Sequence, residues 1–211
     1  NGSGKTTLVK LLCRLYDPSD GVITLDGIDL RRFESAALRR EFSVIFQDFV
    51  RYHLTARENI WLGNTDLPPE DDGVIAAARD SGADDFIRAL PRGYETVLGK
   101  LFEEGEELSI GEWQKVALSR AFLRDAQIIV LDEPTSSMDA RTEYAVFGNF
   151  RKLAAGRTAI LISHRFSTVR MADRIFVMQE GRVIEGGTHD ELIRGGGTYA
   201  RMFETQARQY R

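Results

Sequence analysis

The chain has 211 residues, 43% of them hydrophobic, which is enough for the buried core of one domain with two lobes. Its formal net charge is −4, and because the 28 basic and 32 acidic residues are dispersed, the sequence has no basic stripe and predicts no nucleic-acid partner. The single cysteine, Cys13, excludes an internal disulfide, and no apolar run approaches the roughly 18 residues that a membrane helix needs.

A glycine-rich turn, NGSGKTT at residues 1–7, opens the chain and leads into a helix that leucine spacing predicts over Lys5 to Tyr16. Phosphate-binding loops have the pattern GxxxxGK[ST], and Gly4, Lys5 and Thr6 match its end. The first glycine of the pattern would fall before the chain begins. We therefore expect a fragment that lacks the strand normally found before such a loop.

Each residue type in this loop has a physical role in phosphate binding. Gly2 and Gly4 let backbone N–H groups approach phosphate oxygens, and the helix N-terminus adds partial positive charge. Lys5 would neutralise the terminal phosphates, and the Thr6 hydroxyl would bind Mg²⁺. The alternative is a turn that only caps a helix.

Strand signals follow the first helix. GVITLDGIDL, at residues 21–30, predicts two strands joined by a tight turn at Asp26 and Gly27. SVIFQ, at residues 43–47, predicts a further strand that ends at Gln47. The Gln47 amide could reach a metal ion or a water molecule, or it could be only a polar residue at a strand end.

At about residues 51–121 the sequence changes to short helical patterns without strong strand signals, which predicts a helical lobe inserted into the fold. The candidate helices, separated by proline and glycine turns, are TARENIWLG, EDDGVIAAARDSG and ADDFIRAL. Residues 1–50 and 122–211 would then form the remaining α/β core.

Two apolar runs after the lobe, AQIIVLDE and TAILISH, predict strands buried on both faces of a parallel sheet, with a crossover helix between them. The first run ends in Asp132 and Glu133, at the carboxyl edge of the sheet where nucleotide phosphates bind. Asp132 would hold Mg²⁺, and Glu133 would orient the attacking water. The alternative is a pair of solvated carboxylates after a core strand.

His164 ends the second run. A lone histidine is as often structural as catalytic, but beside a phosphate loop we expect it to contact the γ-phosphate. The remaining sequence predicts a hairpin over residues 174–187, a capping box at Thr188 and Glu191, and a last helix around residues 199–206.

Together these motifs resemble the nucleotide-binding domain of ABC transporters over essentially the whole chain. The resemblance rests on NGSGKTT, LSIGEWQKVALSRAF, IIVLDEPTSSMD and ILISHR. Exporters are the most similar branch, because LLCRLYDPSDGVITLDGIDL, TARENI and the C-terminal tail resemble segments of exporter ATPase domains. The implied fold is α/β: a P-loop NTPase, RecA-like core with a mostly parallel sheet and an inserted ABC α-helical subdomain, its N-terminal strands missing.

By this resemblance the chain is an ATPase that uses ATP and Mg²⁺. The catalytic residues are expected to be Glu133, His164 and Gln47, and the metal ligands Thr6, Gln47 and Asp132. The residues expected to contact ATP are Asn1, Gly2, Ser3, Gly4, Lys5, Thr6, Thr7, Ser109, Gly111, Glu112 and Asp139.

One position departs from the family pattern in the signature segment, LSIGE at residues 108–112. This segment carries Ile110 where the family has the first glycine of LSGGQ. A β-branched residue tolerates positive φ badly. If Ser109 caps the following helix, Ile110 is its first residue and needs only negative φ, which predicts a functional but weakened signature. Ser109 and Glu112 also have capping-box spacing, so the alternative is a structural role without nucleotide contact. Asp139 could likewise cap a helix.

The resemblance also implies partners. Two such domains would pair head to tail around ATP and drive a membrane domain, N-terminal in the same full-length chain, at the cytoplasmic face of the inner membrane. That membrane domain would dock in an amphipathic groove on the helical lobe. Three alternatives remain: a soluble ABC-type ATPase acting on DNA or the ribosome, a weakly hydrolysing regulatory half of a heterodimeric transporter, and a small-molecule P-loop kinase.

Overall fold

The structure, a computed structural model, describes residues 2–101, 105–135 and 138–209. The chain divides into two compact units, residues 1–39 with 161–211 and residues 40–160. The boundaries predicted near residues 50 and 121 both fall inside the second unit. Across the described ranges, none of the helices has the length and apolar character needed to span a bilayer.

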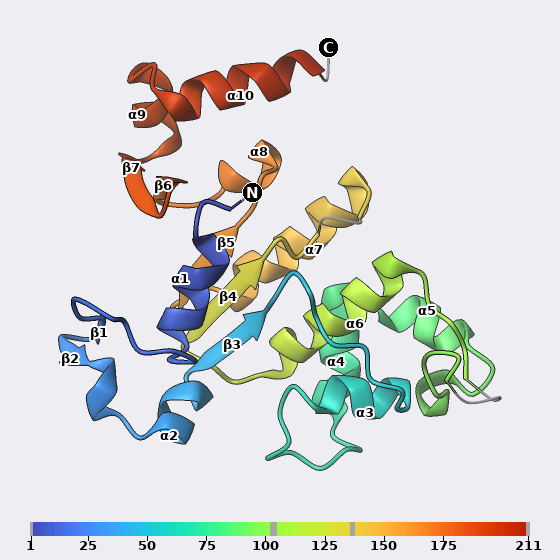
Figure 1. Cartoon of the computed structure of the whole chain (residues 1–211). Helices are drawn as coiled ribbons and strands as arrows, with labels where there is room; N and C mark the ends of the chain where they lie inside the picture. The colour runs from blue at the N-terminus through green and yellow to red at the C-terminus, as the bar shows by residue number, and fades with distance from the viewer. Residues whose placement is uncertain (1, 102–104, 136–137, 210–211) are drawn as a thin grey trace. The chain divides into compact units, whose positions relative to one another are not determined.

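The first unit combines helices with two antiparallel hairpins (Figure 1). Its elements, with α2 at the boundary, are α1 (Lys5–Leu12), β1 (Thr24–Leu25), β2 (Ile28–Asp29), a 3-10 helix (Leu30–Arg32), α2 (Ser35–Arg40), α8 (Phe166–Val169), β6 (Ile175–Gln179), β7 (Arg182–Gly187), α9 (His189–Arg194) and α10 (Thr198–Gln209). The turn between β1 and β2 has φ of 50° at Asp26 and 80° at Gly27, which confirms the predicted tight turn.

Helix α1 is shorter than predicted, because it ends at Leu12. Arg14 follows with a φ of 48°, a left-handed conformation that cannot continue the helix. The Arg14 guanidinium donates hydrogen bonds to the carbonyl oxygens of Leu30, at 3.2 Å, and Phe33, at 2.8 Å. These distant partners end α1 early, and the leucine spacing could not reveal them. Cys13, directly after α1, is buried.

The C-terminal elements of the first unit pack around a small apolar cluster. Its members from α8, β6, α9 and α10 are Phe166, Val169, Ile175, Leu192 and Tyr199. Helix α9 begins with the predicted capping box of Thr188 and Glu191. Helices α2 and α8 were absent from the sequence prediction, and the cluster accounts for α8, whose apolar side chains are covered by these later elements.

The second unit contains the sheet, in the strand order β3–β4–β5. Its elements are β3 (Phe42–Ile45), α3 (Ala56–Trp61), α4 (Asp72–Ser81), α5 (Asp84–Ala89), a 3-10 helix (Gly93–Glu95), α6 (Ile110–Leu123), β4 (Ile128–Asp132), α7 (Ala140–Leu153) and β5 (Thr158–Ile162), the last of which runs across the unit boundary. Strands β3 and β4 are parallel and pair from Phe42 with Ile128 to Ile45 with Leu131.

Burial differs between the two apolar strands. Strand β4 is buried along its whole length, as predicted. The same prediction is wrong for β5, where Thr158 and Ala159 are exposed. Because β5 is the last strand in the order, its faces are less covered than those of the central strand. Strand β3 is also terminal, but α6 packs on it, and the Ser43 hydroxyl donates to the Ala121 carbonyl oxygen at 3.3 Å.

Helices α3 to α6 gather beside β3 and β4 as a helical lobe (Figure 1). Its buried core consists of Ala56, Ile60, Val74, Ala77, Ala78, Ala83, Ile87, Tyr94, Leu98, Leu108, Trp113, Val116 and Leu123. Trp113, on the first turn of α6, is 1% exposed. Truncating an aromatic side chain of this size in a core costs about 3–5 kcal/mol of folding free energy, so the start of α6 is held firmly in the lobe.

Candidate functional site

The phosphate loop has the backbone that its glycines predict. Gly2 and Gly4 have φ of 80° and 91°, where an L side chain is strained. Gly4 is the N-cap of α1 and has no side chain to cap it, and the first turn carries no acidic residue. The positive end of α1 is therefore arranged to bind an anion. Asn1 lies outside the described residues.

The turn of the β6–β7 hairpin contacts the phosphate loop. The Gly181 N–H donates to the Ser3 carbonyl oxygen at 3.2 Å, and a Cβ added to Gly4 would lie 3.4 Å from the Gly181 Cα. The Lys5 ammonium donates to the Ser3 hydroxyl at 2.8 Å. The sequence predicted the hairpin over residues 174–187 but not this contact, because the partner of Gly181 is almost the whole chain length away.

Three predicted catalytic or metal residues lie at one edge of the sheet in the second unit. Since Ile45 pairs with Leu131 in parallel strands, Gln47 and Glu133 each follow two residues beyond this pair. Asp132 is the last residue of β4 and is 2% exposed. Strand β3 ends at Ile45, so Gln47 is just outside the strand that was predicted to include it.

Glu133 has an unusual backbone. Its φ of 50° is rare for a residue with a side chain, and such conformations cluster at functional positions. The Gln114 side chain, which is 3% exposed on α6, donates to the Glu133 carbonyl oxygen at 3.4 Å. This contact, which no sequence pattern predicts, ties α6 to the backbone of Glu133 directly after β4.

The donor set suits Mg²⁺. In the second unit Gln47 and Asp132 offer amide and carboxylate oxygens at the sheet edge, the hard ligands that this ion prefers, and in the first unit Thr6 offers a hydroxyl oxygen. Within the described residues there is no cluster of three or more His, Cys, Asp or Glu residues that could hold a metal alone.

The signature segment forms the expected cap. The Ser109 hydroxyl accepts from the Glu112 N–H at 3.3 Å, and the Glu112 carboxylate accepts from the Ser109 N–H at 2.8 Å and its hydroxyl at 2.7 Å. Ile110 is the first residue of α6 and is 58% exposed, so the prediction that it needs only a helical φ is confirmed. Contact of Ser109, Gly111 and Glu112 with nucleotide stays a prediction.

Asp139 caps α7, as predicted. Its carboxylate accepts from the backbone N–H groups of Arg141 and Thr142, both at 3.0 Å, and from the Thr142 hydroxyl at 2.7 Å. These bonds hold the pKa of the Asp139 carboxyl below its usual value, and the bond from the Thr142 hydroxyl has the largest effect. Asp139 is exposed and stays ionised at neutral pH.

His164 lies in the first unit, as the phosphate loop does, and the other described site residues lie in the second. It is exposed and follows β5 by two residues, because the strand ends at Ile162 and not at the histidine. Each unit thus carries one part of the predicted catalytic set.

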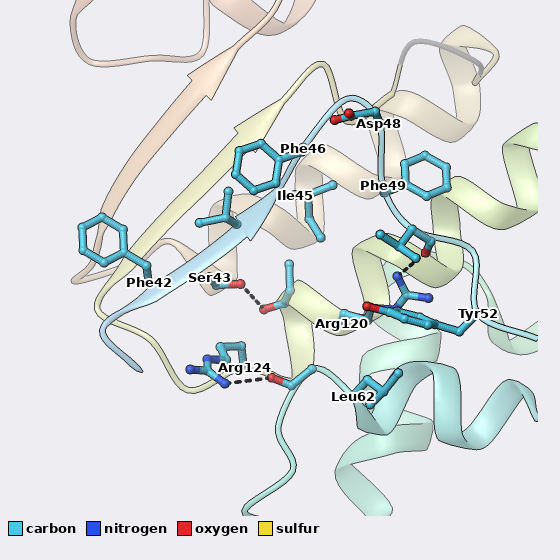
Figure 2. Close-up of a pocket in the computed structure, with 14 residues that line it drawn as sticks. Phe42, Ser43, Ile45, Phe46, Asp48, Phe49, Tyr52, Leu62, Arg120 and Arg124 are labelled. Atoms are coloured by element: carbon cyan, nitrogen blue, oxygen red, sulfur yellow. Dashed lines mark hydrogen bonds between the residues drawn. The ribbon is translucent and has the colours of Figure 1, made fainter. Parts of the chain in front are cut away.

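A pocket of about 320 Å³ lies in the second unit between β3, the segment after Gln47 and α6 (Figure 2). It is lined by Phe42, Ser43, Val44, Ile45, Phe46, Asp48, Phe49, Val50, Tyr52, Leu62, Gly63, Arg120, Ala121 and Arg124. The mixture is amphipathic, with aromatic side chains beside two arginines and one aspartate. This is the character predicted for a docking groove.

Arg120 organises one wall of this pocket. Its guanidinium donates to the Val50 carbonyl oxygen at 2.7 Å and to the carbonyl and amide oxygens of Asn59, at 2.9 and 2.7 Å. It also lies 4.9 Å from the centre of the Tyr52 ring (Figure 2). Burial lowers the pKa of Arg120 to about 10, with Tyr52 opposing the shift. Arg120 therefore joins α6 to α3 and to the segment after Gln47.

Known proteins resemble this chain over nearly its whole length. The ABC transporter family model matches residues 1–136. The mitochondrial potassium channel ATP-binding subunit of Pongo abelii is 45% identical over 208 residues, which are 98% of this chain and 28% of that protein. The ATP-dependent lipid A-core flippase of Methylobacillus flagellatus is 43% identical over 206 residues, 98% of this chain and 35% of that protein.

The fold has a match among solved structures. A bacterial Atm1-family ABC exporter with ATP bound superposes with a TM-score of 0.90 and 39% identity, covering 98% of this chain and 35% of that one. The chain spans about a third of the length of these relatives. The match confirms the predicted α/β class. The chain belongs to the ABC transporter family and is an ATP-binding ATPase domain of the exporter type.

Proposed function

We propose that this domain powers export by a membrane domain, through ATP-dependent pairing with a second domain of the same kind. The observation that carries the proposal is the superposition of nearly the whole chain on an exporter with ATP bound. The membrane domain would precede this domain in the same polypeptide. The ATPase domain would then lie at the cytoplasmic face of the inner membrane.

Nucleotide binding would use the phosphate loop and the residues that follow the parallel strands. Gly4, Lys5 and Thr6 would hold the phosphates through backbone N–H groups, an ammonium and a hydroxyl. Thr6, Asp132 and Gln47 would hold Mg²⁺, which when bound neutralises charge on the phosphates. Support comes from the oxygen donors at the sheet edge and from the left-handed glycines of the loop.

By the family resemblance, Glu133 and His164 would act in the hydrolysis step. Glu133 would accept hydrogen bonds from the attacking water and orient it toward the γ-phosphorus. His164 would donate a hydrogen bond to the γ-phosphate and stabilise the charge that develops there. Phosphoryl transfer needs this positioning and charge stabilisation more than it needs covalent chemistry.

The signature segment would complete the site of the partner domain. Ser109, Gly111 and Glu112 at the start of α6, with Asp139 at the start of α7, would face the ATP held by the other domain. A ligand that contacts both domains favours the closed pair only by its differential affinity, so loss of the γ-phosphate would favour reopening.

The pocket beside Gln47 is the proposed docking surface for a helix of the membrane domain. Val50, on the pocket wall, is 55% exposed. A benzophenone attached to Val50→Cys in the full-length protein should crosslink to the membrane domain, because an amphipathic helix seated there would lie within reach. Burial raises the pKa of the Cys13 thiol to about 11, against an opposing effect of Arg39, so Cys13 should stay unlabelled.

The matched control for this crosslink is Val183→Cys, since Val183 is 58% exposed on β7. Mass spectrometry would identify the crosslinked peptides in membrane vesicles. We expect membrane-domain peptides from Val50→Cys and none from Val183→Cys. Equal yields from the two positions, or none from Val50→Cys, would contradict the docking surface.

Ile110→Gly provides a separate prediction about the signature. Because Ile110 is exposed at the first turn of α6, its removal should leave the fold intact and let the backbone approach phosphate more closely. We expect the steady-state ATPase rate of the full-length protein to stay unchanged or to rise modestly, by about twofold over the wild type. Ile110→Ala, which also removes the branched side chain but keeps a better helix former than glycine, is the comparison variant. A large loss of rate would mean that the isoleucine packs against something essential.

A further inference from the structure

We infer that Gln206, on the C-terminal helix α10, is a positioning residue that holds the backbone of His164 in place for the hydrolysis step. The inference rests on the proposed role of His164 at the γ-phosphate. It gives α10 a part in ATP hydrolysis beyond packing.

The Gln206 side chain makes two hydrogen bonds, one to the residue before Arg165 and one to the residue after it. The Gln206 Nε2 donates to the His164 carbonyl oxygen at 3.2 Å, and the Phe166 N–H donates to the Gln206 Oε1 at 3.1 Å. Because both partners are backbone groups of fixed polarity, they define which end of the amide is nitrogen. A primary amide can donate to one of them and accept from the other at once.

Helix α10, which carries Gln206, is held in place by contacts with α8, α9 and β7. The Phe203 ring packs edge-on against Phe166, with centroids 5.2 Å apart, and the Tyr199 ring does the same at 5.4 Å. The Tyr199 hydroxyl shares a hydrogen bond with the His189 Nδ1 at 2.8 Å. At the N-terminus of α10, the Glu185 carboxylate accepts hydrogen bonds from the backbone N–H groups of Thr198 and Tyr199, the latter at 3.1 Å. Movement of α10 would break several of these contacts.

The segment that carries His164 needs such support. It lies between the end of β5 and the four-residue helix α8, and His164 itself is exposed. Its local hydrogen bonds include the one from the Arg165 N–H to the Ser163 hydroxyl at 3.0 Å and those from the Thr168 and Val169 N–H groups to the Arg165 carbonyl oxygen, both at 3.1 Å. A histidine displaced by about 1 Å from a productive position can lose up to a hundredfold in rate, so the two bonds from Gln206 matter for catalysis.

The test compares variants of Gln206 in the full-length protein. Gln206→Met keeps the length of the side chain and removes both bonds, while Gln206→Glu keeps the acceptor and removes the donor. We expect Gln206→Met to lower kcat for ATP about tenfold with KM changed less than about twofold, and Gln206→Glu to fall in between. Glu204→Gln, at an exposed position on the same helix, is the matched control and should behave as the wild type.

His164→Ala and the double variant separate this inference from the proposed function. We expect His164→Ala to remove most turnover and Gln206→Met to add little in that background, because both act through one group. If His164→Ala has normal turnover, the proposed role of His164 is wrong and the inference falls with it. If His164→Ala is inactive while Gln206→Met has normal kcat, or if the two effects multiply, only the inference is overturned. Nucleotide binding by each variant checks that it is folded.

Discussion

Glu133→Gln in the full-length protein should keep ATP binding while ATP turnover falls by about a thousandfold. Replacing the carboxylate by an amide removes the group that would orient and polarise the attacking water, and such groups contribute typically 10²–10⁴-fold to rate. The substitution keeps the shape of the side chain. It also leaves the hydrogen bond from Gln114 intact, because that bond uses the Glu133 carbonyl oxygen.

A consequence of slow turnover is accumulation of the closed pair. With ATP bound and not hydrolysed, the two domains should stay together and appear as a stable closed state by size or by crosslinking. Glu70→Gln, at an exposed position in the same unit, is the matched control and should hydrolyse ATP normally. An unchanged rate in Glu133→Gln would show that the water is activated by another residue.

Lys5→Ala should act on a different step from Glu133→Gln, because it should weaken ATP binding itself. A charge-assisted hydrogen bond is worth about 1.5–3 kcal/mol, so removal of the ammonium should weaken ATP affinity by about tenfold to a hundredfold and reduce turnover accordingly. In the structure the Lys5 ammonium makes a hydrogen bond to Ser3 within the loop, and its loss should leave α1 folded.

Lys10→Ala is the control for this substitution. Lys10 is exposed in the last turn of the same helix, so the variant removes the same charge from the negative end of α1. We expect its ATP affinity to match that of the wild type in equilibrium binding measurements. If Lys5→Ala also binds ATP as the wild type does, the loop does not hold the phosphates.

Local patterns were sufficient for features set by neighbouring residues. The glycines of the phosphate loop, the capping box of Ser109 and Glu112, and the turn at Asp26 depend on residues within a few positions of each other. The family resemblance predicted roles for Gln47 and Glu133 at one site, and the parallel pairing of β3 with β4 places both residues at one edge of the sheet. These features carry most of the candidate site.

Features set by distant residues could not be predicted in this way. Helix α1 ends early because Arg14 bonds to carbonyl oxygens beyond the β1–β2 hairpin, and nothing near Arg14 in the sequence signals that. The partners of Arg120 and Gln206 lie 70 and 42 residues away, at Val50 and His164. A polar side chain on a helix gives no sign of such a partner until the fold is known.

The most direct test of the proposed site is an experimental structure of the full-length Glu133→Gln protein with ATP and Mg²⁺. We expect the Thr6 hydroxyl to lie at about 2.1 Å from the ion, with Asp132, His164 and the substituted side chain around the same γ-phosphate. Ser109 of the second domain should face that phosphate. A nucleotide held by the phosphate loop alone, with Asp132 and His164 far from it, would contradict the single shared site.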